Sequence, residues 1–179
     1  MTAIYLRCYG GMVLLYRIGS RVVGNSYTGT AGGHFEQEEL NDPKTCVLRE
    51  LQEETGLAED DLENLTMRYV TLRLKNGEIR QNYYFFADLK EHVAKRWGLA
   101  GGGRYRPAVL ERQQVILEEI FSSEGRLEWV PEEPLSGLQM PASAKYMIEH
   151  YLSVGKNTEE IYGGMTMDGG AEFVALREF

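Results

Sequence analysis

The 179-residue chain has little cysteine and histidine, with two cysteines, Cys8 and Cys46, and three histidines. Two thiols do not make the disulfide framework of a small secreted domain. The histidines are scattered and lack the paired spacing of a zinc site. The sequence also has no run of about 18 apolar residues and no basic amino-terminal segment leading into an apolar stretch. We therefore expect neither a membrane anchor nor secretion, but a cytoplasmic protein.

Positive charge is also scarce. The chain has 19 Lys and Arg against 27 Asp and Glu, a formal net charge of −8. A broad phosphate-backbone interface needs clustered cations, so a nucleic-acid partner is disfavoured. A small anionic substrate is still compatible with this charge if a metal ion supplies the local positive charge. The glycine triplet 101–103 precedes Arg104 and not the Lys-Ser/Thr of a P-loop, and no Gly-x-Ser-x-Gly motif is present.

What is present is a globular composition, 43% hydrophobic and 26% charged, which predicts one domain over residues 1–179. The segment with the most informative residue pattern is a predicted helix. Asp42 can serve as its N-cap, Pro43 suits the first helical position, and Gly56 is placed to end it.

On this helix Glu50, Glu53 and Glu54 fall within roughly a third of the circumference. A neighbouring arc carries the apolar side to be buried, including Val47 and Leu51. Like charges about 5–6 Å apart repel, and a hard divalent cation relieves the repulsion. An all-oxygen carboxylate site suits Mg²⁺ or Mn²⁺. The alternative for acidic pairs at this spacing is a solvated helix face.

The stretch from Gly32 to Leu57 resembles the signature of the Nudix hydrolases. That signature reads Gly, five residues, Glu, seven residues, then Arg-Glu-aliphatic-x-Glu-Glu-x-Gly-aliphatic. Gly33 and Glu39 match its first part, and the run 49–57 matches its second part at every position. Nine residues, not seven, separate Glu39 from Arg49, so the loop around Leu40 to Asp42 holds two extra residues.

The resemblance implies an α/β fold, an α/β/α sandwich with a mixed sheet between the Glu50-bearing helix and a helix that starts at Pro141. It also implies Mg²⁺ as the cofactor, which Mn²⁺ can replace, bound by Glu50, Glu53 and Glu54 together with the carbonyl of Gly32.

The resemblance further implies that Glu53 or Glu54 takes the proton of the attacking water. Arg49 matches the arginine that orients a catalytic carboxylate, so we expect a structural ion pair there. Glu39 is a further expected metal-site residue. The two extra residues leave open whether it reaches the metal or whether Glu36 or Glu38 replaces it.

By the same resemblance, the reaction is hydrolysis of a nucleoside diphosphate linked to another moiety. The Gly-Gly-His-Phe-Glu start is similar to that of the nucleoside-triphosphate hydrolases, including 8-oxo-dGTP diphosphatases. This favours a nucleoside triphosphate cleaved to a nucleoside monophosphate and pyrophosphate. Nucleotide sugars and dinucleoside polyphosphates stay open, because the signature encodes phosphate chemistry and not the leaving group. A catalytically silent nucleotide-binding or regulatory domain is the second hypothesis, and the intact carboxylates argue against it.

Alternation and turn signals predict the rest of the sheet. We expect a hairpin from Ile4–Leu6 and Met12–Tyr16, a short strand at Tyr27–Thr30, a second hairpin from Leu65–Leu74 and Ile79–Leu89, and a strand at Leu127–Val130.

Residues 91–123 are the least typical of the family. We predict an inserted arm that ends in an amphipathic helix opened by Pro107, with apolar residues Val109, Leu110, Ile116, Leu117, Ile120 and Phe121 near helical spacing. The arm could form part of a substrate lid, a homodimer contact or a decoration. Residues 157–179 form a C-terminal extension that we expect to add an edge strand.

Overall fold

The computed structural model of the chain describes residues 1–17, 25–99, 115–122, 125–133, 135–167 and 169–177. These residues contain one mixed sheet with the strand order β6-β7-β2-β1-β5-β4-β8-β9, and β3 pairs with β2 outside this path. β1 pairs with β5 and β4 pairs with β8 in parallel, whereas the other pairs are antiparallel. The strands are β1 (Thr2–Cys8), β2 (Gly11–Arg17), β3 (Ser26–Thr28), β4 (Leu62–Lys75), β5 (Glu78–Leu89), β6 (Val115–Ser122), β7 (Gly125–Pro131), β8 (Ile161–Met167) and β9 (Gly170–Leu176).

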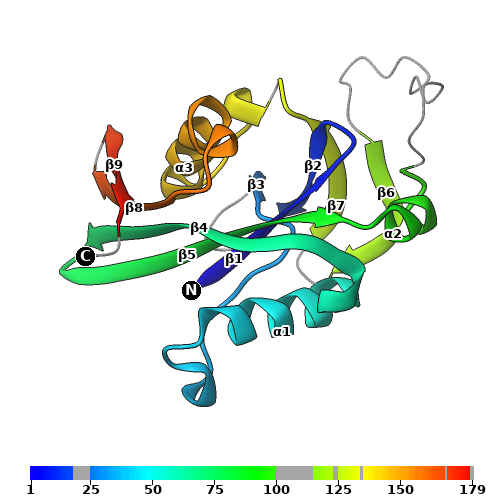
Figure 1. The fold of residues 1–179 in the computed structure, drawn as a ribbon, viewed down its shortest axis with the longest axis horizontal. Helices are drawn as coiled ribbons and strands as arrows, with labels where there is room; N and C mark the ends of the chain where they lie inside the picture. The colour runs from blue at the N-terminus through cyan, green and yellow to red at the C-terminus, as the bar shows by residue number, and fades with distance from the viewer. Residues whose placement is uncertain (18–24, 100–114, 123–124, 134, 168, 178–179) are drawn as a thin grey trace.

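Helices cover the two faces of this sheet (Figure 1). α1 (Pro43–Thr55) lies below the sheet in that view, α3 (Ala142–Ser153) lies above it, and the short α2 (Glu91–Arg96) lies at one end. The expected α/β/α sandwich is therefore confirmed. In the described ranges no helix is both long and apolar enough to cross a membrane. Among the described residues, four single 3₁₀ turns lie in the connections: η1 (Gln37–Glu39), η2 (Glu59–Asp61), η3 (Leu135–Gly137) and η4 (Gly155–Asn157).

The core has two parts because side chains alternate across each strand. Toward α1, the fully buried Ile4 and Leu6 of β1 share a cluster with Val47 and Leu51 of the helix. Toward α3, an aromatic cluster contains Tyr5, Tyr69, Tyr84, Phe86 and Tyr151.

The four consecutive aromatics of β5 divide between these clusters as the alternation requires. Tyr84 and Phe86 face α3, where the Phe86 ring stacks on Tyr151 with centroids 3.8 Å apart. Tyr83 and Phe85 belong to the α1 side. The strand is therefore clamped between the two helices.

The prediction of a helix in the second half of the 91–123 arm is wrong for the residues that the structure describes. Val115–Ser122 is a strand, β6, which pairs antiparallel with β7. The short apolar run Val-Ile-Leu does not distinguish a helix from a strand by spacing alone. Pairing with a neighbouring strand decides the outcome, since it provides the backbone hydrogen bonds. Val109 and Leu110 lie outside the described residues.

The C-terminal extension forms more than the expected edge strand. β8 joins the sheet parallel to β4, with Thr71 opposite Gly164, and β9 turns back to pair antiparallel with β8. A parallel pairing depends on a long crossover, here the one through α3, which local sequence does not reveal.

The ends of α1 are capped as predicted. The Asp42 carboxylate accepts hydrogen bonds from the backbone N–H and the hydroxyl of Thr45, at 3.1 and 2.8 Å. Pro43 occupies the first turn. Gly56 ends the helix with a left-handed φ of 72°, and its N–H donates to the Gln52 carbonyl at 2.9 Å. Both ends of the carboxylate-bearing helix are thus fixed locally.

We expect Asp42→Ala to lower the free energy of unfolding by about 1 kcal/mol, because it removes the cap from the exposed N–H groups of the first turn. Urea unfolding measures the change. Asp42→Asn is the matched control, since asparagine caps about equally well. Equal losses in the two variants would show that the cap hydrogen bonds contribute nothing to stability.

Candidate active site

The signature residues come from two segments, the loop after β3 and helix α1. The loop is fixed to the start of β1, where the Thr2 N–H donates to the Gly33 carbonyl at 2.8 Å and the Ile4 N–H donates to the Ala31 carbonyl at 2.9 Å. A Cβ atom added at Gly32 would collide with the Thr2 carbonyl oxygen. Only glycine allows this approach, so the loop can pass directly against the strand.

Arg49 of α1 lies at the centre of the acidic residues. Its Nε donates to Glu39 Oε1 at 2.7 Å and its Nη2 to Glu39 Oε2 at 3.0 Å. The same guanidinium lies 3.0 Å from Glu50 Oε1 and 3.0 Å from Glu53 Oε2. Its Nη2 also donates to the His34 carbonyl at 3.0 Å. The expected ion pair of Arg49 is present, and it includes three carboxylates.

Glu39 reaches the cluster despite the two extra residues in the loop. It is buried at the end of η1, and its Oε2 also accepts the backbone N–H of Glu36 at 3.0 Å. The hydrogen bonds from Arg49, followed by the one from Glu36, lower the pKa of Glu39 from 4.5 to about 2. Hydrogen bonding to Glu39 in turn raises the pKa of Arg49. Both Glu39 oxygens are therefore engaged in holding the loop to the helix.

Glu50 and Glu54 lie against the glycine doublet. The Gly32 N–H donates to Glu54 Oε2 at 3.1 Å. A Cβ atom added at Gly33 would overlap the carboxylate of Glu50. The glycine at position 33 thus leaves the space that the Glu50 carboxylate occupies. Sequence reasoning identified Gly33 by its match to the signature but did not identify this contact, nor the His34 carbonyl as a partner of Arg49.

The donor set fits a hard divalent cation in its chemistry, since it consists of carboxylate and carbonyl oxygens. Within the described part of the chain, no three His, Cys, Asp or Glu side chains are grouped closely enough to hold a metal ion. The guanidinium of Arg49 instead supplies the positive charge among Glu39, Glu50 and Glu53. The Glu53 side chain is 57% exposed, so this end of the cluster is open to solvent.

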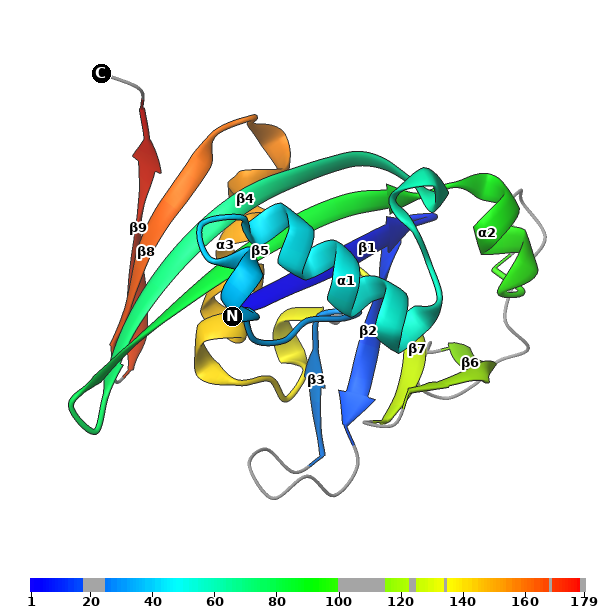
Figure 2. The same ribbon diagram turned by 90° about the horizontal axis from the view of Figure 1, so that it is seen from below.

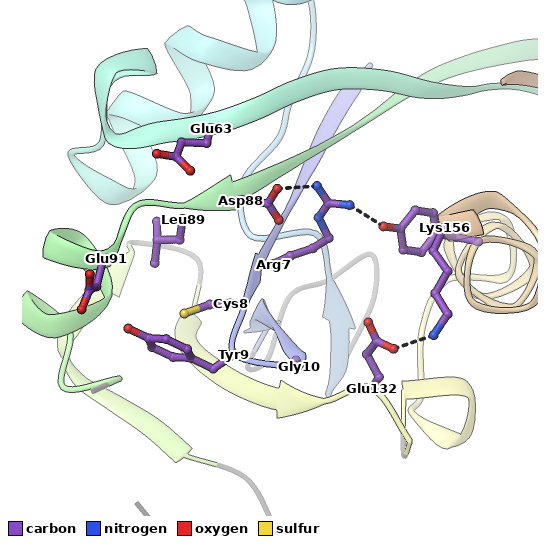
Figure 3. A pocket seen from close by; sticks show the side chains of 12 residues that line it. Arg7, Cys8, Tyr9, Gly10, Glu63, Asp88, Leu89, Glu91, Glu132 and Lys156 are labelled. Carbon is purple, nitrogen blue, oxygen red and sulfur yellow. Dashed lines mark hydrogen bonds and ion pairs between the residues drawn. The ribbon is translucent and has the colours of Figure 1, made fainter. Parts of the chain in front are cut away.

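Two clefts of about 570 and 430 Å³ lie elsewhere, near the opposite end of β1. Both are lined by Arg7, Tyr151 and Lys156. Arg7 follows Thr2 by five residues, which puts it roughly 16 Å along β1 from Thr2, the residue to which the loop after β3 is hydrogen-bonded. The Arg7 guanidinium lies 2.8 Å from Asp88, and the Lys156 ammonium lies 2.7 Å from Glu132. Figure 3 shows both pairs as dashed lines. These cations are paired, and the clefts are separate from the signature site.

Comparison with known proteins identifies the family of the chain. A sequence profile described as the NUDIX domain matches residues 2–147. The chain belongs to the NUDIX family. It is a Nudix hydrolase, an enzyme of the pyrophosphohydrolase class, as the signature predicted. No match was found among curated proteins.

Solved structures show the same fold at low sequence identity. The E. coli ORF135 protein has a TM-score of 0.56 at 14% identity, with 88% of this chain and 91% of that chain covered. A C. elegans Ap4A hydrolase in a binary complex has a TM-score of 0.53 at 14% identity, with 88% and 96% covered. The M. smegmatis Nudix hydrolase RenU has a TM-score of 0.51 at 15% identity, with 87% and 83% covered. These likenesses establish the Nudix fold of the chain.

The Glu39–Arg49 pair predicts a pH dependence of stability. The folded-state pKa of Glu39 is lowered to about 2, below its ordinary value of 4.5. The ionised carboxylate therefore stabilises the fold fully above about pH 5, and this contribution is lost as the pH falls from there toward 2. We expect the difference in Tm between the wild type and Glu39→Gln to be constant from pH 7 to 5 and to shrink below pH 4.5. A difference that stays the same down to pH 3 would contradict the ion pair.

Proposed function

We propose that this Nudix enzyme hydrolyses a nucleoside triphosphate, including oxidised forms such as 8-oxo-dGTP, to a nucleoside monophosphate and pyrophosphate with Mg²⁺ as cofactor. Mn²⁺ would replace Mg²⁺. The observation that carries the proposal is the arrangement of Glu50, Glu53 and Glu54 on one side of α1, next to the Gly32–Gly33 backbone and organised by Arg49.

In this proposal Glu50, Glu53, Glu54 and the Gly32 carbonyl hold the metal. A bound Mg²⁺ would neutralise charge on the phosphate oxygens and make the attacking water more acidic. Glu53 or Glu54 accepts the proton of the water that attacks phosphorus. The exposure of Glu53 gives that carboxylate access to substrate and solvent.

Arg49 and Glu39 act as positioning residues. Arg49 contacts Glu50 and Glu53 at once, so it fixes their relative orientation and offsets their repulsion. Glu39 uses both oxygens to hold Arg49 and one of them to bind the Glu36 backbone. We therefore assign Glu39 to support of the metal site, where losses of about 10- to 100-fold are typical, and not to direct coordination.

An aromatic pair at the loop after β3, the loop that carries Gly32 and Gly33, supports a nucleoside substrate. Phe35 directly follows His34, and its ring packs edge-on against Tyr83 with centroids 5.6 Å apart. Both side chains are only partly buried, and aromatic faces of this kind stack on nucleobases. The pair does not discriminate between bases. A dinucleoside polyphosphate, the substrate type in the name of the Ap4A hydrolase, is the second candidate.

The proposed partners and location follow from charge and chemistry. With a net charge of −8, the enzyme would act on a small nucleotide and not on a nucleic acid. We propose that it works in the cytoplasm, where nucleoside triphosphates and Mg²⁺ are both available.

The test is hydrolysis of a substrate panel with millimolar Mg²⁺. We expect pyrophosphate release from nucleoside triphosphates. If the enzyme instead requires another leaving group, phosphate-containing products should form from Ap4A or from nucleotide sugars. Glu53→Gln should lower turnover at least about 100-fold, the scale for loss of a general base or metal ligand. Circular dichroism and Tm confirm that the variant folds.

Binding of nucleotides without turnover of any panel member would favour the catalytically silent domain. Near-normal turnover by folded Glu53→Gln would remove Glu53 from the catalytic set.

A further inference from the structure

One end of the sheet displays an apolar surface that no helix covers. It contains seven of the eleven large hydrophobic side chains that are exposed in the described residues, with exposed fractions between 42% and 74%. We call it the open face, and it consists of Leu72 and Leu74 of β4, Ile79 of β5, Met165 and Met167 of β8, and Val174 and Leu176 of β9.

The strand register places these side chains on one side of the sheet. Leu72 is opposite Met165, and Leu74 is opposite Ile79. Cross-strand partners share a face and residues two apart on a strand do as well. Val174 pairs with Gly163, two residues before Met165, so β9 continues the same surface. A Cβ atom at Gly163 would lie 3.0 Å from the Leu176 side chain, which confirms that Leu176 projects to this side.

The open face is on the α1 side of the sheet, but α1 does not reach it. The helix packs through Val47 and Leu51 on Ile4, Leu6 and their neighbours, and this cluster includes no open-face residue. Figures 1 and 2 show β8, β9 and the β4–β5 turn extending beyond α1. The other side of the same strands is filled, because Tyr69, Tyr162 and Phe173 pack around His150 of α3.

At this end of the sheet the uncovered open face is apolar, whereas the opposite face of the β4–β5 turn carries charged side chains. An isolated hairpin in water would not leave such an apolar face uncovered. On the α3 side of the β4–β5 turn, Arg73 is opposite Arg80 and Lys75 is opposite Glu78. On the open face, Glu172, opposite Met165, is the one charged residue that the register places among the seven in the described strands. A sheet face that stays in water is normally polar. Depletion of charge marks the core of a protein interface instead.

The exposed apolar area of the open face is close to the area that each partner buries in a dimer contact. Seven large side chains, on average more than half exposed, present roughly 700 Å² of apolar surface, above the roughly 300–600 Å² of the largest apolar patch on a typical monomer. A standard interface buries about 800 Å² per partner, and homodimer interfaces are the more apolar class.

We propose that the open face is a homodimer interface, in which two copies of this chain pack these faces against each other around a two-fold axis. A charge-poor apolar surface is complementary to itself, as an isologous contact requires. Pairing of two β9 edges alone would leave the seven side chains in water, so the contact is placed on the face and not on the edge.

The experiment compares adjacent residues of β5 with the same replacement, Ile79→Glu on the open face and Arg80→Glu on the other side. Masses are measured by light scattering and sedimentation from 1 to 100 µM. The wild type and Arg80→Glu should show twice the protomer mass of 20.3 kDa. Ile79→Glu should raise the dimer dissociation constant at least about 100-fold, because a two-fold contact buries the new charge twice.

Val174→Glu provides the second variant, on β9, and should weaken the dimer in the same way. Circular dichroism identifies folded variants, and the wild-type mass tests the proposal by itself. A monomeric wild type at 100 µM, or a dimer that neither glutamate weakens relative to Arg80→Glu, would overturn it. Association that continues beyond two copies would also overturn the closed two-fold contact.

Discussion

The interaction on which the site depends is the pairing of one guanidinium with several carboxylates. Arg49 contacts Glu39, Glu50 and Glu53 within 3.0 Å, and each of these anions would otherwise repel the others. The arginine also binds the His34 carbonyl, so the same group attaches the glycine loop to the helix. The loop, the helix and their charges are therefore one unit, and an incoming divalent cation would share the work of charge neutralisation that Arg49 now does.

The fold holds this unit from both sides. α1 is anchored beneath the sheet by Val47 and Leu51, and the glycine loop is hydrogen-bonded to the first residues of β1. On the opposite face, stacking of Phe86 on Tyr151 fixes β5 and α3. β1, to which the loop is hydrogen-bonded, pairs with β5, so the sheet beside the loop is held by packing that is independent of the acidic residues. Substitutions in the carboxylate cluster should consequently change chemistry more than they change the fold.

Local signals in the sequence were sufficient for α1, because its caps, its apolar arc and its carboxylates all depend on residues within a few positions. Local signals were insufficient where pairing with segments distant in the sequence determines the structure. β6 is a strand because it pairs with β7, and β8 lies parallel to β4 through a crossover. The position of Glu39 could not be predicted, since helical geometry does not extend into the loop with two extra residues. The open face could not be predicted, because it depends on the register of four strands, β4, β5, β8 and β9.

The central claim is that the carboxylates of α1 bind a divalent cation. The most direct measurement is the Tm as a function of Mg²⁺ concentration, for the wild type and for Glu50→Gln/Glu54→Gln. Binding to the folded state stabilises by about 2.7 kcal/mol at 100 times Kd, which corresponds to roughly 5–10 °C for a domain of this size. The account predicts this rise in the wild type and little or none in the double variant. An equal rise in both proteins would mean that the ion binds elsewhere.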